Sequence, residues 1–224
     1  MRNPRKRPLE ELAPYLLPDR PRPEGILPAT PQPPVPIDWS ELFSNDQPVE
    51  IEVGFGKGMF LVRAATARPD VNFFGIEVVR KYQLFAANRV AARGLSNVRL
   101  AWADARLLLR DRVPAESVQT VHVYFPDPWW KTRHHKRRVF TAEFAATVLR
   151  VLRPGGHLSI ATDVEAYFAV IKETVAELPA FVPLPPPEPT AGADDLDYLT
   201  NFERKFRKQG LPIYRALYEK QRSE

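Results

Sequence analysis

The chain has 224 residues, of which 44% are hydrophobic and 11% aromatic, so it can build the core of one large domain. Its net charge of +5 and isoelectric point near 9.5 indicate an anionic partner such as nucleic acid. The absence of cysteine excludes disulfides, thiolate metal ligands and a cysteine nucleophile. With no apolar signal segment and no run of about 18 apolar residues, we expect a cytoplasmic protein without membrane attachment.

The first 37 residues are rich in proline and begin with a basic cluster. Proline fixes its own φ and lacks an N–H donor, so this composition disfavours helices and sheet pairing. We therefore expect residues 1–37 to form an extended or mobile arm, and residues 38–224 to form the folded domain.

From residue 38 onward, helical and strand patterns alternate. Apolar alternation and β-branched residues predict strands at residues 49–53, 72–76, 97–102, 118–125, 157–162 and 211–218. Helices are predicted at residues 38–43, from 59 until Pro69, and at 79–93, 105–110, 142–152 and 164–178. Residues 183–190 are predicted to be a proline-rich connection, and residues 200–209 to begin as a helix. This order predicts a doubly wound α/β fold, whose mostly parallel sheet is covered on both faces.

A glycine-rich loop follows the first of these strands. Gly54, Gly56 and Gly58 stand between that strand and a helix, where the backbone can approach a ligand closely. The dinucleotide fingerprint needs a glycine where this chain has Met59. Glu52, just before the loop, would repel a pyrophosphate but attract an amine or a sulfonium cation.

Two further acids end the next two strands. Glu77 is placed to accept hydrogen bonds from ribose hydroxyls, and Asp104 to accept one from the amino group of adenine. Strand ends of this kind meet at one edge of a parallel sheet. An amine or cation, a ribose and an adenine together describe S-adenosylmethionine.

The fourth strand leads into an aromatic and then cationic loop. Asp127 lies between Pro126 and Pro128, which restrict its backbone to extended conformations at a strand end. Trp129 and Trp130 follow, and residues 131–138 add five fixed positive charges and two histidines. Paired tryptophans beside such a cluster favour a site for a base attached to a phosphate backbone.

Several segments together resemble the bacterial tRNA (guanine-N7)-methyltransferases. They are Glu-Ile-Glu-Val-Gly-Phe-Gly-Lys-Gly at 50–58, Gly-Ile-Glu at 75–77, Asp-Ala at 104–105, Phe-Pro-Asp-Pro-Trp at 125–129, residues 131–138, Ala-Thr-Asp at 161–163 and Thr-Asn-Phe-Glu-Arg-Lys at 200–205. The similarity covers about residues 49–218. Trp130 departs from the family, which more often has a proline or a small polar residue there.

The resemblance implies a class I methyltransferase fold with a seven-stranded sheet, S-adenosylmethionine as cofactor and tRNA as partner, with no metal and a monomer or homodimer. It implies methyl transfer to N7 of the variable-loop guanosine, with Asp127 as the catalytic residue. The cofactor-binding residues it implies are Glu52, Gly54, Gly56, Gly58, Glu77, Asp104, Ala105 and Asp127. The tRNA-binding residues it implies are Lys131, Asp163, Thr200, Asn201, Phe202 and Glu203.

Other interpretations remain open. A nicotinamide-dependent oxidoreductase would use the same fold and Glu77, although Met59 and Glu52 disfavour it. A non-catalytic RNA-binding module would explain the basic loop but not the acidic strand ends. Thr200 and Glu203 also have the spacing of a helix capping box, and Asp163 could cap the helix that follows it.

Overall fold

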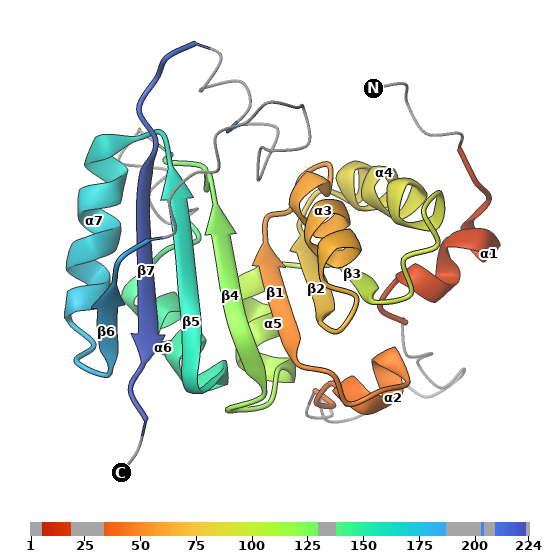
Figure 1. The fold of residues 1–224 in the computed structure, drawn as a ribbon, viewed down its shortest axis with the longest axis horizontal. Helices are drawn as coiled ribbons and strands as arrows, with labels where there is room; N and C mark the ends of the chain where they lie inside the picture. Colours follow the sequence, from red (N-terminus) through yellow and green to blue (C-terminus); the bar gives the residue numbers. More distant parts are fainter. Residues whose placement is uncertain (1–5, 19–33, 130–137, 187–202, 204–208, 223–224) are drawn as a thin grey trace, which may run out of the picture.

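Figure 1 shows the fold in a computed structural model that describes residues 6–18, 34–129, 138–186, 203 and 209–222. Its centre is a seven-stranded sheet in the order β3-β2-β1-β4-β5-β7-β6. The strands are β1 (Val49–Val53), β2 (Asn72–Glu77), β3 (Val98–Trp102), β4 (Val118–Tyr124), β5 (Leu152–Thr162), β6 (Phe181–Leu184) and β7 (Tyr214–Lys220). β1 to β5 are parallel to one another, and β7 runs antiparallel between β5 and β6. The predicted mostly parallel α/β sheet is confirmed.

The strand order reverses between β1 and β4. The chain builds β2 and β3 on one side of β1, and then crosses to build β4 and β5 on the other. Ligands of doubly wound folds bind at such a switch point, beyond the carboxyl ends of the strands. The topology therefore predicts a ligand site at the loops that follow β1, β2, β3 and β4.

Helices cover both faces of the sheet. They are α2 (Trp39–Phe43), α3 (Met59–Ala67), α4 (Arg80–Ala91), α5 (Ala105–Arg112), α6 (Ala142–Val151) and α7 (Glu165–Ala176). In β2, Phe73 joins the apolar cluster under α3 and α4, whereas Phe74 and Ile76 join the cluster under α5 and α6. This alternation sends successive side chains to opposite faces; Figure 1 shows α3 in front of the sheet and α5 and α6 behind it.

Local capping explains where several helices begin and end. The side chain of Asp38 accepts a hydrogen bond from the N–H of Glu41, and that of Thr141 accepts one from Phe144. Gly94 adopts a left-handed φ of 61° just after α4, where glycine commonly ends a helix.

The expectation of an extended or mobile arm is wrong for the described part of the N-terminal segment. Residues Leu9–Leu12 form helix α1 and residues Ala13–Tyr15 form a 3₁₀ turn, η1. Leu12 is 1% exposed, and the N–H of Leu17 donates to the carbonyl of Leu100 in β3. The prolines are compatible with this structure because Pro14 occupies the first turn of η1, where its missing donor costs nothing.

Near proline and glycine residues, the predicted start of β5 is wrong and β6 was not predicted. β5 begins at Leu152, five residues before the predicted start, and contains Pro154, Gly155 and Gly156 at a shift in its register with β4. A Cβ on Gly156 would lie 2.8–3.2 Å from three carbonyl oxygens, so the close backbone contact requires glycine. β6 was missed because Pro183 lies within it, which an edge strand tolerates.

The remaining predicted boundaries differ less. β7 covers Tyr214–Lys220 rather than 211–218. Most of residues 200–209, predicted to begin as a helix, lie outside the described residues. Within the part of the chain that the structure describes, no helix is long and apolar enough to cross a membrane.

Candidate cofactor and substrate site

The loop between β1 and α3 is shaped by three glycines with left-handed backbones. Gly54, Gly56 and Gly58 have φ values of 74°, 53° and 67°, which L residues with side chains adopt only with strain. A Cβ on Gly58 would lie 2.7 Å from the Cβ of Ala86 in α4, whereas Gly54 and Gly56 have open space. Two of the three glycines therefore leave their surroundings free for a ligand, and the third lets α3 approach α4.

Glu77, at the end of β2, fixes the glycine loop. One carboxylate oxygen accepts a hydrogen bond from the N–H of Gly56, and the other accepts one from the N–H of Val79, both at 2.9 Å. Each oxygen keeps a second lone pair, so the carboxylate can still accept from another donor. The acid predicted to hold a ribose thus also holds the loop beside it.

Glu52, at the end of β1, carries an unsatisfied carboxyl group. Its side chain is buried, and its Oε2 has no hydrogen-bond partner among the described residues. Burial, together with the nearby charge of Glu77, raises the pKa of Glu52 to about 8. A buried carboxyl without a partner is costly unless a ligand completes it, and a cationic amine has the right charge and donors to do so.

Asp104 caps helix α5, and Ala105 is the first residue of that helix. The Asp104 carboxylate accepts hydrogen bonds from the N–H of Arg106 at 2.9 Å and from its guanidinium at 2.7 Å. The side-chain hydrogen bond from Arg106 lowers the pKa of Asp104 and outweighs the opposing effect of burial. Asp104 therefore has a structural role at the site edge that its sequence position did not reveal.

Asp127 projects from a loop that is fixed at both ends. The side chain is exposed, while the flanking Phe125 and Trp129 have φ values of 52° and 43°. The N–H of Phe125 donates to Ala161 in β5 at 2.7 Å, and the Arg138 guanidinium donates to the carbonyl of Pro128 at 2.7 Å. Left-handed backbone at two bulky residues marks strain that these contacts maintain, which is typical of functional loops.

Asp163 and Glu203 have different surroundings. Asp163 follows β5 and is half-buried, but the N-cap residue of α7 is Val164, whose N–H donates to the hydroxyl of Thr162. The capping alternative for Asp163 is therefore wrong. Glu203 is 2% exposed and accepts a 2.6 Å hydrogen bond from Arg215 in β7, which anchors it against the sheet. Lys131, Thr200, Asn201 and Phe202 lie outside the described residues.

A buried polar chain under α3 was not predicted. Arg68 donates to Glu50 at 2.6 and 2.8 Å, and Glu50 also pairs with His122 Nε2 at 2.9 Å. His122 Nδ1 contacts the Tyr124 hydroxyl at 2.9 Å, which contacts the Ser159 hydroxyl at 3.1 Å. Burial opposes ionisation of Glu50, but its bonds to His122 and Arg68 outweigh burial and lower its pKa to about 2.

This polar chain fixes the end of β4, because Tyr124 directly precedes the loop that carries Asp127. One signal could have found it. Glu50 and Glu52 in β1, and His122 and Tyr124 in β4, are polar pairs at a spacing of two in strands expected to be buried. Such pairs place polar groups on one sheet face, where they must find partners.

Comparisons with known proteins agree with this arrangement. Residues 46–216 match the family model described as "Putative methyltransferase". The chain is 45% identical to the tRNA (guanine-N(7)-)-methyltransferase of Rhodopirellula baltica, over 84% of this chain and 71% of that protein. It is 35% identical to the protein of the same name from Colwellia psychrerythraea, over 82% of this chain and 75% of that protein.

Solved structures support the fold. The 16S rRNA methyltransferase KamB superimposes with a TM-score of 0.60 and 17% identity, covering 82% of this chain and 92% of that one. TrmN from Thermus thermophilus gives a TM-score of 0.54 and 20% identity, covering 81% of this chain and 46% of that one. From the extent of the family match and the identity to its relatives, the chain belongs to the tRNA (guanine-N(7)-)-methyltransferase family.

Proposed function

We propose that the chain transfers a methyl group from S-adenosylmethionine to N7 of the variable-loop guanosine of tRNA. The relatives named above carry that tRNA activity in their names. The observation that carries the proposal is the buried, unpartnered carboxyl of Glu52 beside a glycine loop with open space. Such a site accommodates a ligand with a cationic amino group. The tRNA substrate further favours a cytoplasmic location.

The described residues fit this cofactor. Glu52 would hold its amino group, and the free lone pairs of Glu77 would accept from its ribose hydroxyls. The end of β3, with Asp104 and Ala105, would border its adenine, with Asp104 kept in place by Arg106. Bound S-adenosylmethionine supplies an electrophilic methyl group on a sulfonium sulfur.

Methyl transfer to guanine N7 does not require a general base. Guanine N7 carries a lone pair and no proton, so the protein must mainly align N7 with the methyl carbon and the sulfur. Alignment of this kind can lower a barrier by about 7–11 kcal/mol in the best cases. Asp127, exposed on its fixed loop, would stabilise the positive charge that reaches the purine ring.

The guanosine itself would be bound by residues from several segments. We assign this role to Lys131, Asp163, Thr200, Asn201, Phe202 and Glu203. For Glu203 the pair with Arg215 supports a positioning role, because one of its oxygens is already engaged. For Asp163, its half-buried position directly after β5 supports a role toward the substrate.

Incubation of unmodified tRNA with the protein and methyl-labelled S-adenosylmethionine tests the proposal. Mass spectrometry of the digested nucleosides should show labelled N7-methylguanosine from the variable loop. A thermal shift with S-adenosylhomocysteine but none with NAD should accompany it. Label in another nucleoside, or a shift with NAD alone, would contradict the proposal.

A further inference from the structure

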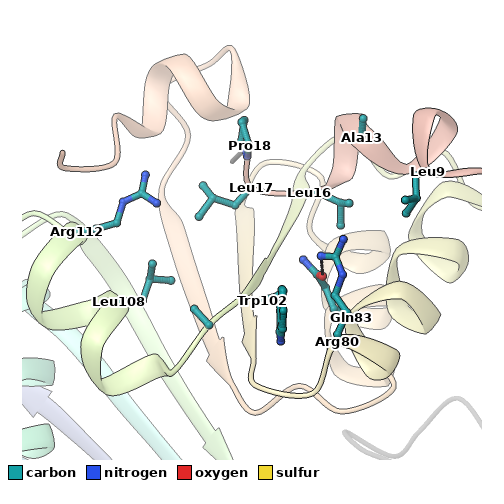
Figure 2. A pocket seen from close by; sticks show the side chains of 11 residues that line it. Leu9, Ala13, Leu16, Leu17, Pro18, Arg80, Gln83, Trp102, Leu108 and Arg112 are labelled. Carbon is teal, nitrogen blue, oxygen red and sulfur yellow. Dashed lines mark hydrogen bonds between the residues drawn. The ribbon is translucent and has the colours of Figure 1, made fainter. Parts of the chain in front are cut away.

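A cavity of about 740 Å³ lies at the β3 edge of the sheet, and none of the cofactor-binding residues proposed above lines it. Its walls come from Leu9, Leu16 and Pro18 of the N-terminal segment, Arg80 of α4, Trp102 of β3 and Arg112 of α5. Figure 2 shows these side chains around the cavity, between the N-terminal segment, α4, β3 and α5. The volume is in the range of small-molecule sites, and it exists because the N-terminal segment packs beside β3.

Trp102 is the most unusual residue of this cavity. It is 58% exposed, although large apolar side chains are costly to leave in water. Its indole N–H donates to the carbonyl of Val78 at 2.9 Å, which fixes the plane of the ring. The ring is therefore held in place while much of its surface remains open.

Arg80 stacks on this ring. Its guanidinium lies 5.2 Å from the ring centroid, and it donates to Gln83. Gln83 is buried and donates to the carbonyl of Leu100 at 3.0 Å, so the arginine is positioned from the core. Figure 2 shows Arg80 and Gln83 together beside Trp102. A positioned cation on a fixed indole is prepared for a ligand with a flat ring and a negative charge.

The charges of the cavity point in the same direction. Among the residues that the structure describes, its lining includes two arginines and no carboxylate. Arg112 also donates to the carbonyl of Val35, an interaction that leaves its positive charge in place. An anionic ligand complements this lining, and an aromatic base complements the indole.

We propose that this cavity binds a nucleotide of the tRNA substrate other than the methylated guanosine, with its base on Trp102 and its phosphate near Arg80. The inference rests on the proposed function, which supplies the polynucleotide. Trp102 ends β3, three strand positions from the end of β4, or roughly 14 Å at about 4.8 Å per strand. One tRNA arm can therefore reach both places.

Binding of unmodified tRNA by Trp102→Ala, Trp102→Phe and Arg80→Ala variants tests this site. Loss of a stacking platform should raise the Kd for tRNA roughly five- to hundredfold in Trp102→Ala, and Trp102→Phe should recover most of it. Arg80→Ala should lower the slope of log K against log salt by about one phosphate contact. Leu107→Ala is the matched control, since Leu107 is 49% exposed on α5 and does not line the cavity.

Two further measurements separate the possible outcomes. Calorimetry with S-adenosylhomocysteine should give the wild-type affinity for Leu107→Ala, and any loss in the Trp102 and Arg80 variants should be smaller than their loss of tRNA affinity, because none of the proposed cofactor residues lines the cavity. An unchanged tRNA Kd in Trp102→Ala overturns the inference. A loss of cofactor affinity equal to the loss of tRNA affinity also overturns it.

Titration with adenosine monophosphate distinguishes a free nucleotide from tRNA. Micromolar binding that Trp102→Ala abolishes, with tRNA binding unchanged, would replace tRNA by a free nucleotide as the ligand. Formation of N7-methylguanosine by the wild type stays a separate readout, so failure of this site and failure of the proposed function are distinguishable.

Discussion

Burial of Glu52, reinforced by the charge of Glu77, raises the pKa of the Glu52 carboxyl to about 8. At pH 7 the free enzyme therefore holds a proton that the cationic amino group of the cofactor would displace. Affinity for S-adenosylhomocysteine should rise from pH 6 to pH 8, by at most roughly tenfold per pH unit. Titration calorimetry at pH 6, 7 and 8 measures this, with Glu52→Gln as a control that should show no such rise. A wild-type affinity independent of pH would remove Glu52 from the amino-group site.

The same proton affects the stability of the free enzyme. The folded carboxyl has a pKa of about 8, against an ordinary value of 4.5, so folding takes up a proton between these pH values. This stabilising contribution is complete below about pH 4.5 and is lost as the pH rises through 8. Thermal unfolding without cofactor should show wild type losing stability from pH 5 to 8 relative to Glu52→Gln. Parallel pH profiles would mean that Glu52 is ionised in the free enzyme.

Substitution of Asp127 tests whether this residue acts in catalysis or in tRNA binding. Asp127→Asn keeps the size of the side chain and removes its charge, so stabilisation of the cationic ring is lost while the loop contacts of Phe125 and Arg138 remain. Single-turnover methylation at saturating cofactor should slow by roughly a hundred- to thousandfold, with little change in KM for tRNA. Asp70→Asn, an exposed acid in the turn before β2, should react like wild type. Equal rates for both variants would mean that Asp127 shapes the loop and does not stabilise the cationic purine ring.

At the scale of elements, helix α3 depends on Gly58 in two ways. Any side chain there is strained at a φ of 67°, and its Cβ would also collide with Ala86. Gly58→Ala should therefore cost about 1–2 kcal/mol from the backbone and a further 1–3 kcal/mol from overpacking. Gly94→Ala is the matched control, because its φ is 61° and no atom lies within 4 Å of the added Cβ. Urea denaturation should show Gly58→Ala as the less stable variant, and equal losses would exclude the clash.

The elements that were predictable are those whose local pattern and tertiary role agree. The five parallel strands show apolar alternation and β-branched residues, and α2 and α6 carry side-chain caps that can be recognised in sequence. The elements α1 and β6 could not be predicted, because proline composition argues against them. What permits them is position, at a first helical turn and at a sheet edge, which only the tertiary structure provides.

The sequence predicted the acids of the candidate site but not the hydrogen bonds that hold them. Glu52, Glu77 and Asp104 follow from strand ends that the sequence shows, so their gathering at one edge was foreseeable. Their hydrogen-bond partners were not, since the bonds from Gly56 to Glu77 and from Arg106 to Asp104 depend on loop geometry. The polar chain that runs from Arg68 through Glu50, His122 and Tyr124 to Ser159 joins residues up to 109 positions apart (Glu50 to Ser159), and sheet register brings its strand residues together.

At the scale of the whole molecule, the net charge of +5 predicts salt-dependent tRNA binding. Each neutralised phosphate contributes about −0.9 to the slope of log K against log salt on duplex regions. Lys136→Ala and Arg137→Ala should each flatten this slope by about that amount. Arg138→Ala should also slow turnover, because Arg138 holds Pro128 and stacks on Tyr167. Arg153→Ala, an exposed cation at the start of β5, is the control, and an unchanged slope in the first two variants would assign them to a solvated loop.

The N-terminal segment beside β3 has a consequence for the protein in a crowded cell. An open sheet has two outer strands, and unpaired N–H and C=O groups there can recruit strands from other chains and begin aggregation. On one side, the bridge between Leu16 and Leu100 and the bond from Leu17 occupy part of β3. On the other side, β6 is only four residues long and contains Pro183, which has no N–H to offer. A chain shortened to begin after Leu17 would leave β3 open to self-association, although every residue of the sheet would still be present.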